Sequence, residues 1–236
     1  MATTFSNRYI FIYSIVMVTI VAITLTIVAI GLKPLQERNI RIEKMQNILT
    51  SVNIDSDVKN AELLYEKYFK NTFVINNKGD EVKNINAFNI DLYYELKKKP
   101  ADRFLPVYVC EGLDSNKYFV VPLRGKGLWG PIWGYISFKQ DFNTIYGAMF
   151  DHKGETPGLG AEINTLEFRK QFFGKQIFAK DSSLTSVKTI KGGAADDDIH
   201  GVDAISGGTI TSNGLSDMLI NTLSDYKAYF KKRLKL

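Results

Sequence analysis

The sequence is poor in the residues that usually carry disulfides, metal ions or acid–base catalysis. It has one cysteine, Cys110, and two histidines, His152 and His200. A single cysteine cannot form an internal disulfide, and Cys110 has no CxxC partner for metal or redox chemistry. Neither histidine lies in an HExxH pattern, which argues against a zinc hydrolase. We therefore expect Cys110 to be a small buried side chain, and neither histidine to be a metal ligand or a base.

A large excess of charge of one sign is also missing. The formal net charge is +5, from 30 Lys and Arg against 25 Asp and Glu. No basic stripe is interleaved with aromatic residues, so a nucleic-acid partner is not expected. The densest basic run, at residues 231–235, is typical of a solvated helix end. Apolar residues make up 45% and charged residues 23%, which excludes a disordered or fibrous chain.

Charge is almost absent from the first 32 residues, where Arg8 is the only charged side chain. Residues 9–32 form a run of 24 residues rich in Ile, Val and Leu. As a helix at roughly 1.5 Å per residue, this run is long enough for a hydrocarbon core of about 30 Å. The apolar core of a signal peptide is only about 7–15 residues long, and no small-x-small cleavage site precedes Lys33. The sequence therefore predicts a retained transmembrane anchor over residues 1–33.

The charges beside this anchor leave its orientation open. Arg8 lies on one side of the apolar run, and the basic residues on the other side are Lys33, Arg38, Arg41 and Lys44. A positive-inside count would keep the large domain in the cytoplasm, but long domains can be translocated regardless of charge. Composition alone does not decide the side.

The rest of the sequence predicts helices around a group of strands. Pro34 is expected to begin a second helical stretch, which forms a stalk over residues 34–55. Further helices are expected after Asp57, over residues 164–173 and after Asn213. The short runs that predict strands are residues 73–75, 105–110, 118–123, 132–138, 145–150 and 186–190. Because strands and helices do not alternate regularly, this order predicts one soluble α+β domain over residues 56–236 with a largely antiparallel sheet.

Two glycine-rich loops adjoin the predicted strands, one after residues 118–123 and one after residues 145–150. The first, residues 125–134, has four glycines around Trp129 and Trp133. Such a loop allows tight turns that place flat apolar side chains beside a bulky group, and a glycine-rich β-corner over the core is the alternative. The second, residues 152–160, offers backbone N–H groups and the Thr156 hydroxyl, which suit an anion or a heterocycle. It matches neither a Walker A loop nor the dinucleotide-binding fingerprint.

A third loop runs from Lys191 to Gly214. Its acidic run, residues 196–198, lacks the ligand spacing of an EF-hand, so we expect a solvated loop and not a calcium site. Ser206-Gly-Gly-Thr209 places a hydroxyl on a loop with no side-chain bulk just before it, at the helix end that favours phosphate. Thr209 is therefore a candidate acceptor for a phosphate-bearing group, and an ordinary N-cap turn is the alternative.

Together, these loops resemble the family formed by the C subunits of the sodium-translocating NADH:quinone reductases (NQR), which have an FMN-binding domain. The segments that carry the resemblance are residues 32–36, 125–130, 154–160 and 203–209. The last, Asp-Ala-Ile-Ser-Gly-Gly-Thr, is close to the flavinylation signal of this family, Asp-x-x-Ser-Gly-Ala-Thr, and departs from it at Gly208. The G subunit of the Rnf electron-transport complex shares the domain plan, but residues 125–130 and Lys191-Gly-Gly-Ala favour the NQR family.

The resemblance implies a covalently bound FMN. Thr209 would carry it through a phosphoester bond, installed by a separate flavin transferase that uses FAD. Asp203 would belong to the signal that the transferase recognises. The other implied cofactor-binding residues are Ser206, Gly207, Gly208 and Thr211 around the attachment, Glu155, Thr156, Gly158 and Leu159 beside the isoalloxazine ring, Lys191 near the flavin or its phosphate, and Leu128 and Trp129 over the site.

The resemblance also implies a function, which is that of an electron-transfer protein within a sodium-pumping NADH:ubiquinone oxidoreductase of the bacterial inner membrane. The flavin domain would face the periplasm, and single electrons from NADH would pass through it to a flavin in the B subunit, on the way to quinone. The expected partners are the A, B, D, E and F subunits of the NQR complex, especially B, D and E, together with the flavin transferase and membrane lipid. Two alternatives stay open: an Rnf-type role between ferredoxin and NAD, and a membrane-anchored binding or assembly module without a redox role.

Overall fold

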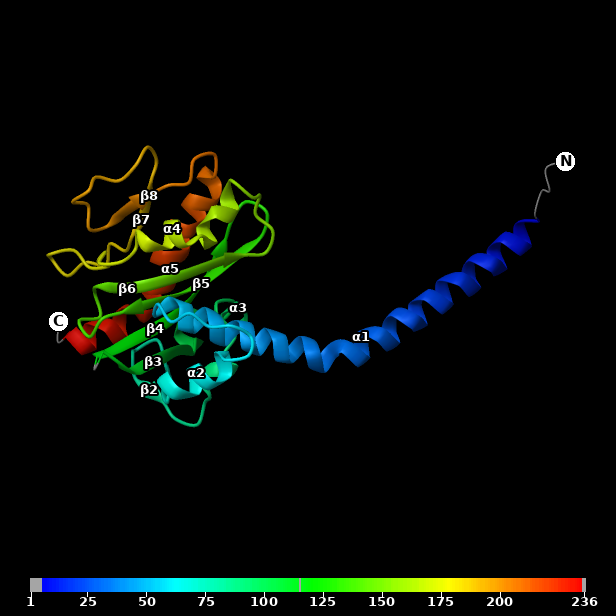
Figure 1. Ribbon diagram of the computed structural model, residues 1–236, viewed down its shortest axis with the longest axis horizontal. Helices are drawn as coiled ribbons and strands as arrows, with labels where there is room; N and C mark the ends of the chain where they lie inside the picture. Colours follow the sequence, from blue (N-terminus) through cyan, green and yellow to red (C-terminus); the bar gives the residue numbers. More distant parts are fainter. Residues whose placement is uncertain (1–5, 115, 235–236) are drawn as a thin grey trace. The chain divides into compact units, whose positions relative to one another are not determined.

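The computed structural model describes residues 6–114 and 116–234 of the protein (Figure 1). Its α-helices are α1 (Asn7–Ser51), α2 (Ala61–Tyr68), α3 (Leu92–Glu95), α4 (Leu166–Lys170) and α5 (Thr209–Leu234). Three short 3₁₀ helices are η1 (Ala87–Asn89), η2 (Pro100–Asp102) and η3 (Gly160–Asn164). The strands are β1 (Asn71–Ile75), β2 (Glu81–Val82), β3 (Leu105–Leu113), β4 (Asn116–Lys126), β5 (Pro131–Phe138), β6 (Ile145–His152), β7 (Lys188–Ile190) and β8 (Gly201–Asp203).

The chain divides into two compact units, one ending at Lys44 and one beginning at Met45. The first unit contains most of α1. Between Tyr9 and Leu32, the large apolar side chains of this helix are exposed, as side chains that face lipid would be. Three threonines in this run donate their hydroxyls to backbone carbonyls four residues earlier, at 2.7 to 2.9 Å, so the helix satisfies its own polar groups. By length and composition, α1 is able to cross a membrane.

The helix continues through Pro34, which lies inside α1. The predicted restart of the helix at Pro34 is therefore wrong. Proline removes one donor from the backbone ladder, and the other hydrogen bonds of this 45-residue helix hold the turns on both sides of it. The domain limits predicted at residues 33 and 55 stay predictions.

The second unit is built on a six-stranded sheet with the order β2-β1-β3-β4-β5-β6 (Figure 1). Every neighbouring pair in this sheet is antiparallel. In a second, smaller sheet, β7 and β8 pair in parallel. The sequence pattern did not predict β8. A strand of three residues is too short to show a period. The predicted α+β fold with a largely antiparallel sheet is confirmed.

Both faces of the large sheet are covered. On one face, α5 places Leu215 and Leu219 in one hydrophobic cluster with Val121 and Leu123 of β4. On the other face, the end of α1 approaches β5, where the Ser137 hydroxyl donates to the carbonyl oxygen of Ser51 at 2.5 Å. These two layers hold the hairpin of β4 and β5 in place, and that hairpin carries the first glycine-rich loop.

The central strand β3 reflects this double cover, because residues 105–110 are all buried. Cys110 has no exposed surface, which confirms the expected small buried side chain. Burial raises the pKa of its thiol to about 12, so the thiol stays protonated and unreactive in the folded protein.

The helix predicted over residues 164–173 is shorter in the structure, where α4 covers Leu166–Lys170. Thr165 begins it as the N-cap, with its hydroxyl oxygen accepting the N–H of Phe168 at 3.3 Å. Residues 160–164 instead form η3, which starts from the second glycine-rich loop. The cap at Thr165 separates the two elements, since an N-cap residue has extended backbone.

Candidate functional site

The first glycine-rich loop is the turn of the β4–β5 hairpin. Gly127 donates its N–H to the carbonyl oxygen of Gly130 at 2.8 Å and closes the turn. Within this turn, Leu128 is 47% exposed and Trp129 is 70% exposed, so these two side chains do not cover the core as the alternative of a β-corner requires. They present apolar surface to whatever lies beside the turn.

The second loop leaves β6 and leads into η3. Thr156, Gly158 and Leu159 are exposed, with Leu159 at 40%. Glu155 differs from them, since only 5% of it is exposed. The carbonyl oxygen of Thr156 accepts the N–H groups of Leu159 and Ala161 at 3.1 and 3.2 Å, which folds the loop into a compact turn. Gly158 has φ +74°, a conformation that favours glycine.

The third loop, residues 191–214, contains β8 and the first residues of α5, and residues 204–208 connect these two elements. Helix α5 begins at Thr209, so the prediction that it begins after Asn213 is wrong. The Ser212 N–H already donates to the carbonyl oxygen of Gly208 at 2.9 Å, as in a helix. The Ser212 hydroxyl does not cap α5, because it accepts the N–H of Ile205 at 3.1 Å and ties the loop down. Thr209 is thus the first residue of a 26-residue helix, and it is exposed.

The structure brings these three loops together. The Glu155 carboxylate accepts the backbone N–H of Trp129 at 2.9 Å and the Thr211 hydroxyl at 2.6 Å. A Cβ built on Gly207 would lie 2.6 Å from Cδ2 of Leu159, so the leucine side chain lies directly on this glycine. The missing Cβ permits this close approach, and Gly207 also has φ +72°, a conformation that favours glycine. Residues 127–130, 154–160 and 206–211 therefore lie next to one another at the start of α5.

The predicted site residues differ in their exposure and in their partners. Ser206 is exposed, and Gly208 is buried. Thr211, expected around the attachment, is only 2% exposed and serves as the partner of Glu155. Glu155, expected beside the ring, has its carboxylate turned to protein donors.

Lys191 and Asp203 lie at the same end of the small β7–β8 sheet. Lys191 is exposed and directly follows β7, whose last residue, Ile190, pairs with Asp203. Among the described residues, no hydrogen bond joins Lys191 to the other predicted site residues. The Asp203 carboxylate accepts the N–H of Ala194 at 2.8 Å, so it also shapes the loop after Lys191.

Gly208 departs from the alanine of the family signal, and the structure gives a reason. A Cβ at this position would lie 2.9 Å from Cγ2 and 3.1 Å from Cβ of Ile205, and 3.3 Å from the backbone nitrogen of Gly160. Alanine would therefore require Ile205 to move. In this chain, glycine at 208 is the residue that fits beside Ile205.

Two glycines that sequence analysis did not assign to the site also shape it. A Cβ on Gly160 would lie 2.4 Å from the Thr211 hydroxyl oxygen and 2.5 Å from Oε2 of Glu155. A Cβ on Gly214 would lie 2.2 Å from the carbonyl oxygen of Lys126, where α5 passes the end of β4. Gly160 does not have a positive φ, so its glycine is not explained by a turn that requires the left-handed region. The sequence included it only as the last residue of the loop segment 154–160.

The histidines have structural partners. Nδ1 of His152 accepts the N–H of Glu155 at 3.1 Å, and Nδ1 of His200 lies 2.7 Å from the carbonyl oxygen of Gln176. Among the described residues, no group of three or more His, Cys, Asp and Glu side chains is arranged to hold a metal ion.

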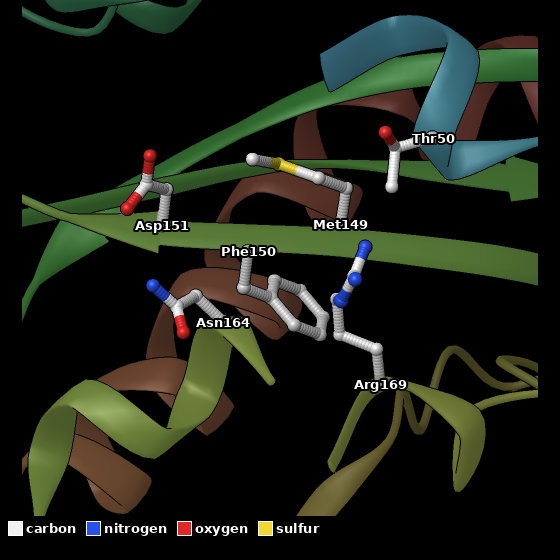
Figure 2. A pocket seen from close by; sticks show the side chains of 6 residues that line it. All are labelled: Thr50, Met149, Phe150, Asp151, Asn164 and Arg169. Atoms are coloured by element: carbon white, nitrogen blue, oxygen red, sulfur yellow. The ribbon is translucent and has the colours of Figure 1, made fainter. Parts of the chain in front are cut away.

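A cavity of about 280 Å³ lies beside β6 and is lined by Thr50, Met149, Phe150, Asp151, Asn164 and Arg169 (Figure 2). Met149 and Asp151 project from one side of the strand and Phe150 from the other, while the Arg169 guanidinium points towards the strand. Burial lowers the pKa of this guanidinium, and the carboxylate of Asp55 opposes the shift. None of the predicted flavin residues lines the cavity, so it is not part of the surface around Thr209.

The sequence and the fold also match known proteins. The family described as the FMN-binding domain matches residues 127–224, a range that includes the hairpin turn at residues 127–130 and the whole of the second and third loops. The chain therefore contains an FMN-binding domain behind a helix that is able to anchor it in a membrane.

Individual relatives define the protein more closely. The chain is 32% identical over 211 residues to the C subunit of the Na(+)-translocating NADH-quinone reductase from Vibrio vulnificus, covering 82% of each chain. It is 31% identical over 223 residues to the corresponding protein of Haemophilus ducreyi, covering 86% of each. The crystal structure of the same subunit from Parabacteroides distasonis aligns with a TM-score of 0.78 at 41% identity, over 84% of this chain and 96% of that one. The Shewanella oneidensis NqrC structure aligns with a TM-score of 0.70 at 26% identity, over 83% and 98%.

The chain belongs to the NqrC family, the C subunits of the Na(+)-translocating NADH-quinone reductases. The predicted resemblance to this family, in preference to the G subunit of the Rnf complex, is confirmed.

Proposed function

We propose that this chain is the electron-transfer subunit of a sodium-pumping NADH:quinone reductase and carries FMN on Thr209 through a phosphoester bond. The observation that carries the proposal is the position of Thr209. Its side chain is exposed at the first residue of α5, at the end of the segment Asp203–Thr209 that resembles the flavinylation signal. A hydroxyl in this position is open to another enzyme, which covalent modification requires.

The start of α5 suits a phosphate diester. The N–H groups in the first turn of a helix have no partner within the helix, and the helix dipole places partial positive charge there. Phosphate groups bind readily at such an end. Exposed Lys191 adds a positive charge at the neighbouring end of β7, which supports its predicted place near the flavin or its phosphate.

The surface around Thr209 also fits a flat heterocycle. Exposed apolar side chains lie on the first two loops and on the first turn of α5, namely Leu128, Trp129, Leu159 and Ile210. Exposed apolar side chains that adjoin one another offer a surface to an apolar ring. In the second loop, a Cβ built on Gly154 or Gly158 would meet nothing within 4 Å, so the backbone is open at these two glycines. We assign Ser206, Gly207, Gly208, Thr156, Gly158 and Leu159 to the border of this surface, with Leu128 and Trp129 as its cover.

The attachment needs no redox change. The Thr209 Oγ would attack the phosphorus of the FMN half of FAD, so that an Oγ–P bond forms and the pyrophosphate P–O bond breaks. AMP leaves, and the hydroxyl proton passes to a base of the flavin transferase. Asp203 would take part in recognition by that enzyme.

A flavin held there would supply one-electron transfer towards quinone. The chain's own residues would position it, shield one side of it and set the local charge. We place the flavin domain on the periplasmic side of the inner membrane, anchored by α1, with the A, B, D, E and F subunits as partners and B, D and E as the nearest. Membrane lipid would surround the apolar part of α1.

The experiment that tests this proposal is expression of the full chain together with its flavin transferase, followed by denaturing electrophoresis and mass spectrometry. We expect in-gel flavin fluorescence and an added FMN phosphoryl mass on the peptide that contains Thr209. Thr209→Ala should abolish both, and Thr209→Ser, which keeps a hydroxyl, should retain some modification. An unmodified wild-type chain would favour a binding or assembly module without a redox role, and fluorescence that persists in Thr209→Ala would move the attachment to another residue.

A further inference from the structure

Glu155 is an unusual side chain in this fold. Glu95 and Glu155 are the two acidic residues that are buried in the described part of the chain. Glu95 has a counter-charge, because Nζ of Lys98 lies 2.8 Å from its carboxylate. Within the same described residues, Glu155 has no ion pair, and the donors to its carboxylate are a backbone N–H and a hydroxyl. A carboxylate buried with neutral partners is unfavourable for folding unless those partners are well placed.

Those partners come from distant parts of the chain. Oε1 accepts the N–H of Trp129 in the hairpin turn, and Oε2 accepts the hydroxyl of Thr211 in the first turn of α5. The backbone N–H of Glu155 itself donates to Nδ1 of His152 at 3.1 Å, which fixes the start of the second loop. One side chain thus links all three loops. Thr211 is two residues from Thr209, so the link acts on the turn that presents the Thr209 hydroxyl.

The backbone leaves no spare room around this carboxylate. A Cβ on Gly127 would lie 2.6 Å from Oε1, and a Cβ on Gly160 would lie 2.5 Å from Oε2. Two glycines therefore let two loops close over the carboxylate from either side. The close packing fixes the Glu155 carboxylate, and its two hydrogen bonds fix the hairpin turn and the first turn of α5.

We propose that Glu155 is a positioning residue for flavin attachment, and that its negative charge lowers the reduction potential of the bound flavin. The first part follows from its hydrogen bonds to Trp129 and Thr211, which hold the cover and the start of α5 together. The second follows from its charge, because a fixed negative charge close to a flavin bound at these loops would oppose the addition of electrons. The proposal rests on Thr209 as the attachment site.

Two substitutions separate these roles. Glu155→Gln keeps a carbonyl oxygen to accept the Trp129 N–H and places an amide where it can donate to the Thr211 hydroxyl oxygen, so it removes the charge and preserves the links. Glu155→Ala removes the charge and both links. Thr211→Val removes the hydroxyl with little change of shape and breaks one link. The matched control for the attachment rate is Glu162→Ala. The Glu162 carboxylate, in η3, accepts the N–H of Gly158 at 2.9 Å, and within the described part of the chain it has no side-chain hydrogen bond to the other two loops.

The experiment uses the full chain expressed with its transferase. It measures the rate of FMN attachment, amide hydrogen exchange of the chain without flavin, and the midpoint potential of the flavinylated protein. We expect Glu155→Ala to slow attachment about tenfold or more, as small misplacements of reacting groups do. Exchange should become faster in residues 127–130 and 206–212. Thr211→Val should speed exchange in residues 206–212. Glu155→Gln should keep the wild-type attachment rate and exchange while its midpoint potential rises. Glu162→Ala should match wild type in attachment rate.

Three outcomes would overturn the proposal or one of its parts. Wild-type attachment and exchange in Glu155→Ala would remove the positioning role, as would a Glu155→Gln variant as defective as Glu155→Ala. An unchanged potential in well-folded Glu155→Gln would remove the electrostatic role. A wild-type chain that never acquires FMN would instead contradict the function proposed for Thr209, and the exchange data would still test whether Glu155 holds the loops. If Glu155→Ala does not fold, Glu155→Gln and Thr211→Val supply the same tests.

Discussion

Gly160→Ala tests the packing at the centre of the site. The new methyl group would lie 2.4 Å from the Thr211 hydroxyl oxygen and 2.5 Å from Oε2 of Glu155, well inside van der Waals contact. The backbone of Gly160 itself accepts alanine, because its φ is not in the left-handed region. The methyl group must therefore push apart the hydroxyl and the carboxylate, which are 2.6 Å from each other.

The expected loss of stability has two sources. Overpacking in a closed site costs about 1–3 kcal/mol. Weakening a hydrogen bond to a buried charged group costs about 1.5–3 kcal/mol. Because the loops relax in part, we expect a total of about 2–4 kcal/mol, which for a unit of this size lowers the melting temperature by roughly 4–16 °C.

Thermal unfolding of the full chain, followed by circular dichroism, measures this change. Gly154→Ala is the matched control, because a Cβ there meets nothing within 4 Å and its φ is also unremarkable. It should leave the melting temperature unchanged or raise it slightly. In a Thr211→Ala background, Gly160→Ala should cost less, since the hydroxyl that the methyl group meets is gone. Equal melting temperatures for Gly160→Ala and Gly154→Ala would refute the close packing of Glu155, Gly160 and Thr211.

Three further predictions follow from exposure and burial. Leu159→Lys places a positive charge on the exposed surface of the second loop, so the flavin potential should rise while covalent attachment at Thr209 survives; an unchanged potential in a well-folded variant would remove Leu159 from the site. Residues 33–236, expressed without the apolar run, should be soluble and unfold cooperatively, and aggregation without a cooperative transition would show that the run belongs to the domain core. The Cys110 thiol should resist alkylation at pH 8 until the chain unfolds, and rapid labelling of the native protein would contradict its burial. Because the pKa of this thiol is raised to about 12 in the folded state, the free energy of unfolding should decline as the pH rises above the unfolded pKa of about 8.5.

Much of the architecture could be predicted from local patterns. The apolar run of α1, the main antiparallel strands and the buried Cys110 each produce a pattern within a few residues of chain. The class of fold followed from the order of these elements. The segment Asp203–Thr209 directed attention to Thr209, because a recognition signal for a modifying enzyme must be carried by contiguous residues.

Some local predictions failed because tertiary contacts decided between two plausible patterns. Ser212 and Asn213 are good helix-capping residues, yet α5 begins four residues before Asn213. The Ser212 hydroxyl accepts the backbone N–H of Ile205 and does not cap the helix. Pro34 looks like a helix start, but it lies within α1 because the turns before and after it hold the helix. In both cases, the residue type permits a boundary and its neighbours in space determine whether one forms.

The sequence by itself determined the membrane anchor, the class of fold and the candidate threonine, because hydrophobic period and short motifs are properties of neighbouring residues. Only the tertiary structure decided the role of Glu155, whose carboxylate could equally have faced a ligand. Its two partners, Trp129 and Thr211, lie 26 and 56 residues away along the chain. No local pattern encodes such a link. It exists because the β4–β5 hairpin, the loop after β6 and the start of α5 meet at one end of the sheet, where glycines leave room for a single carboxylate between them.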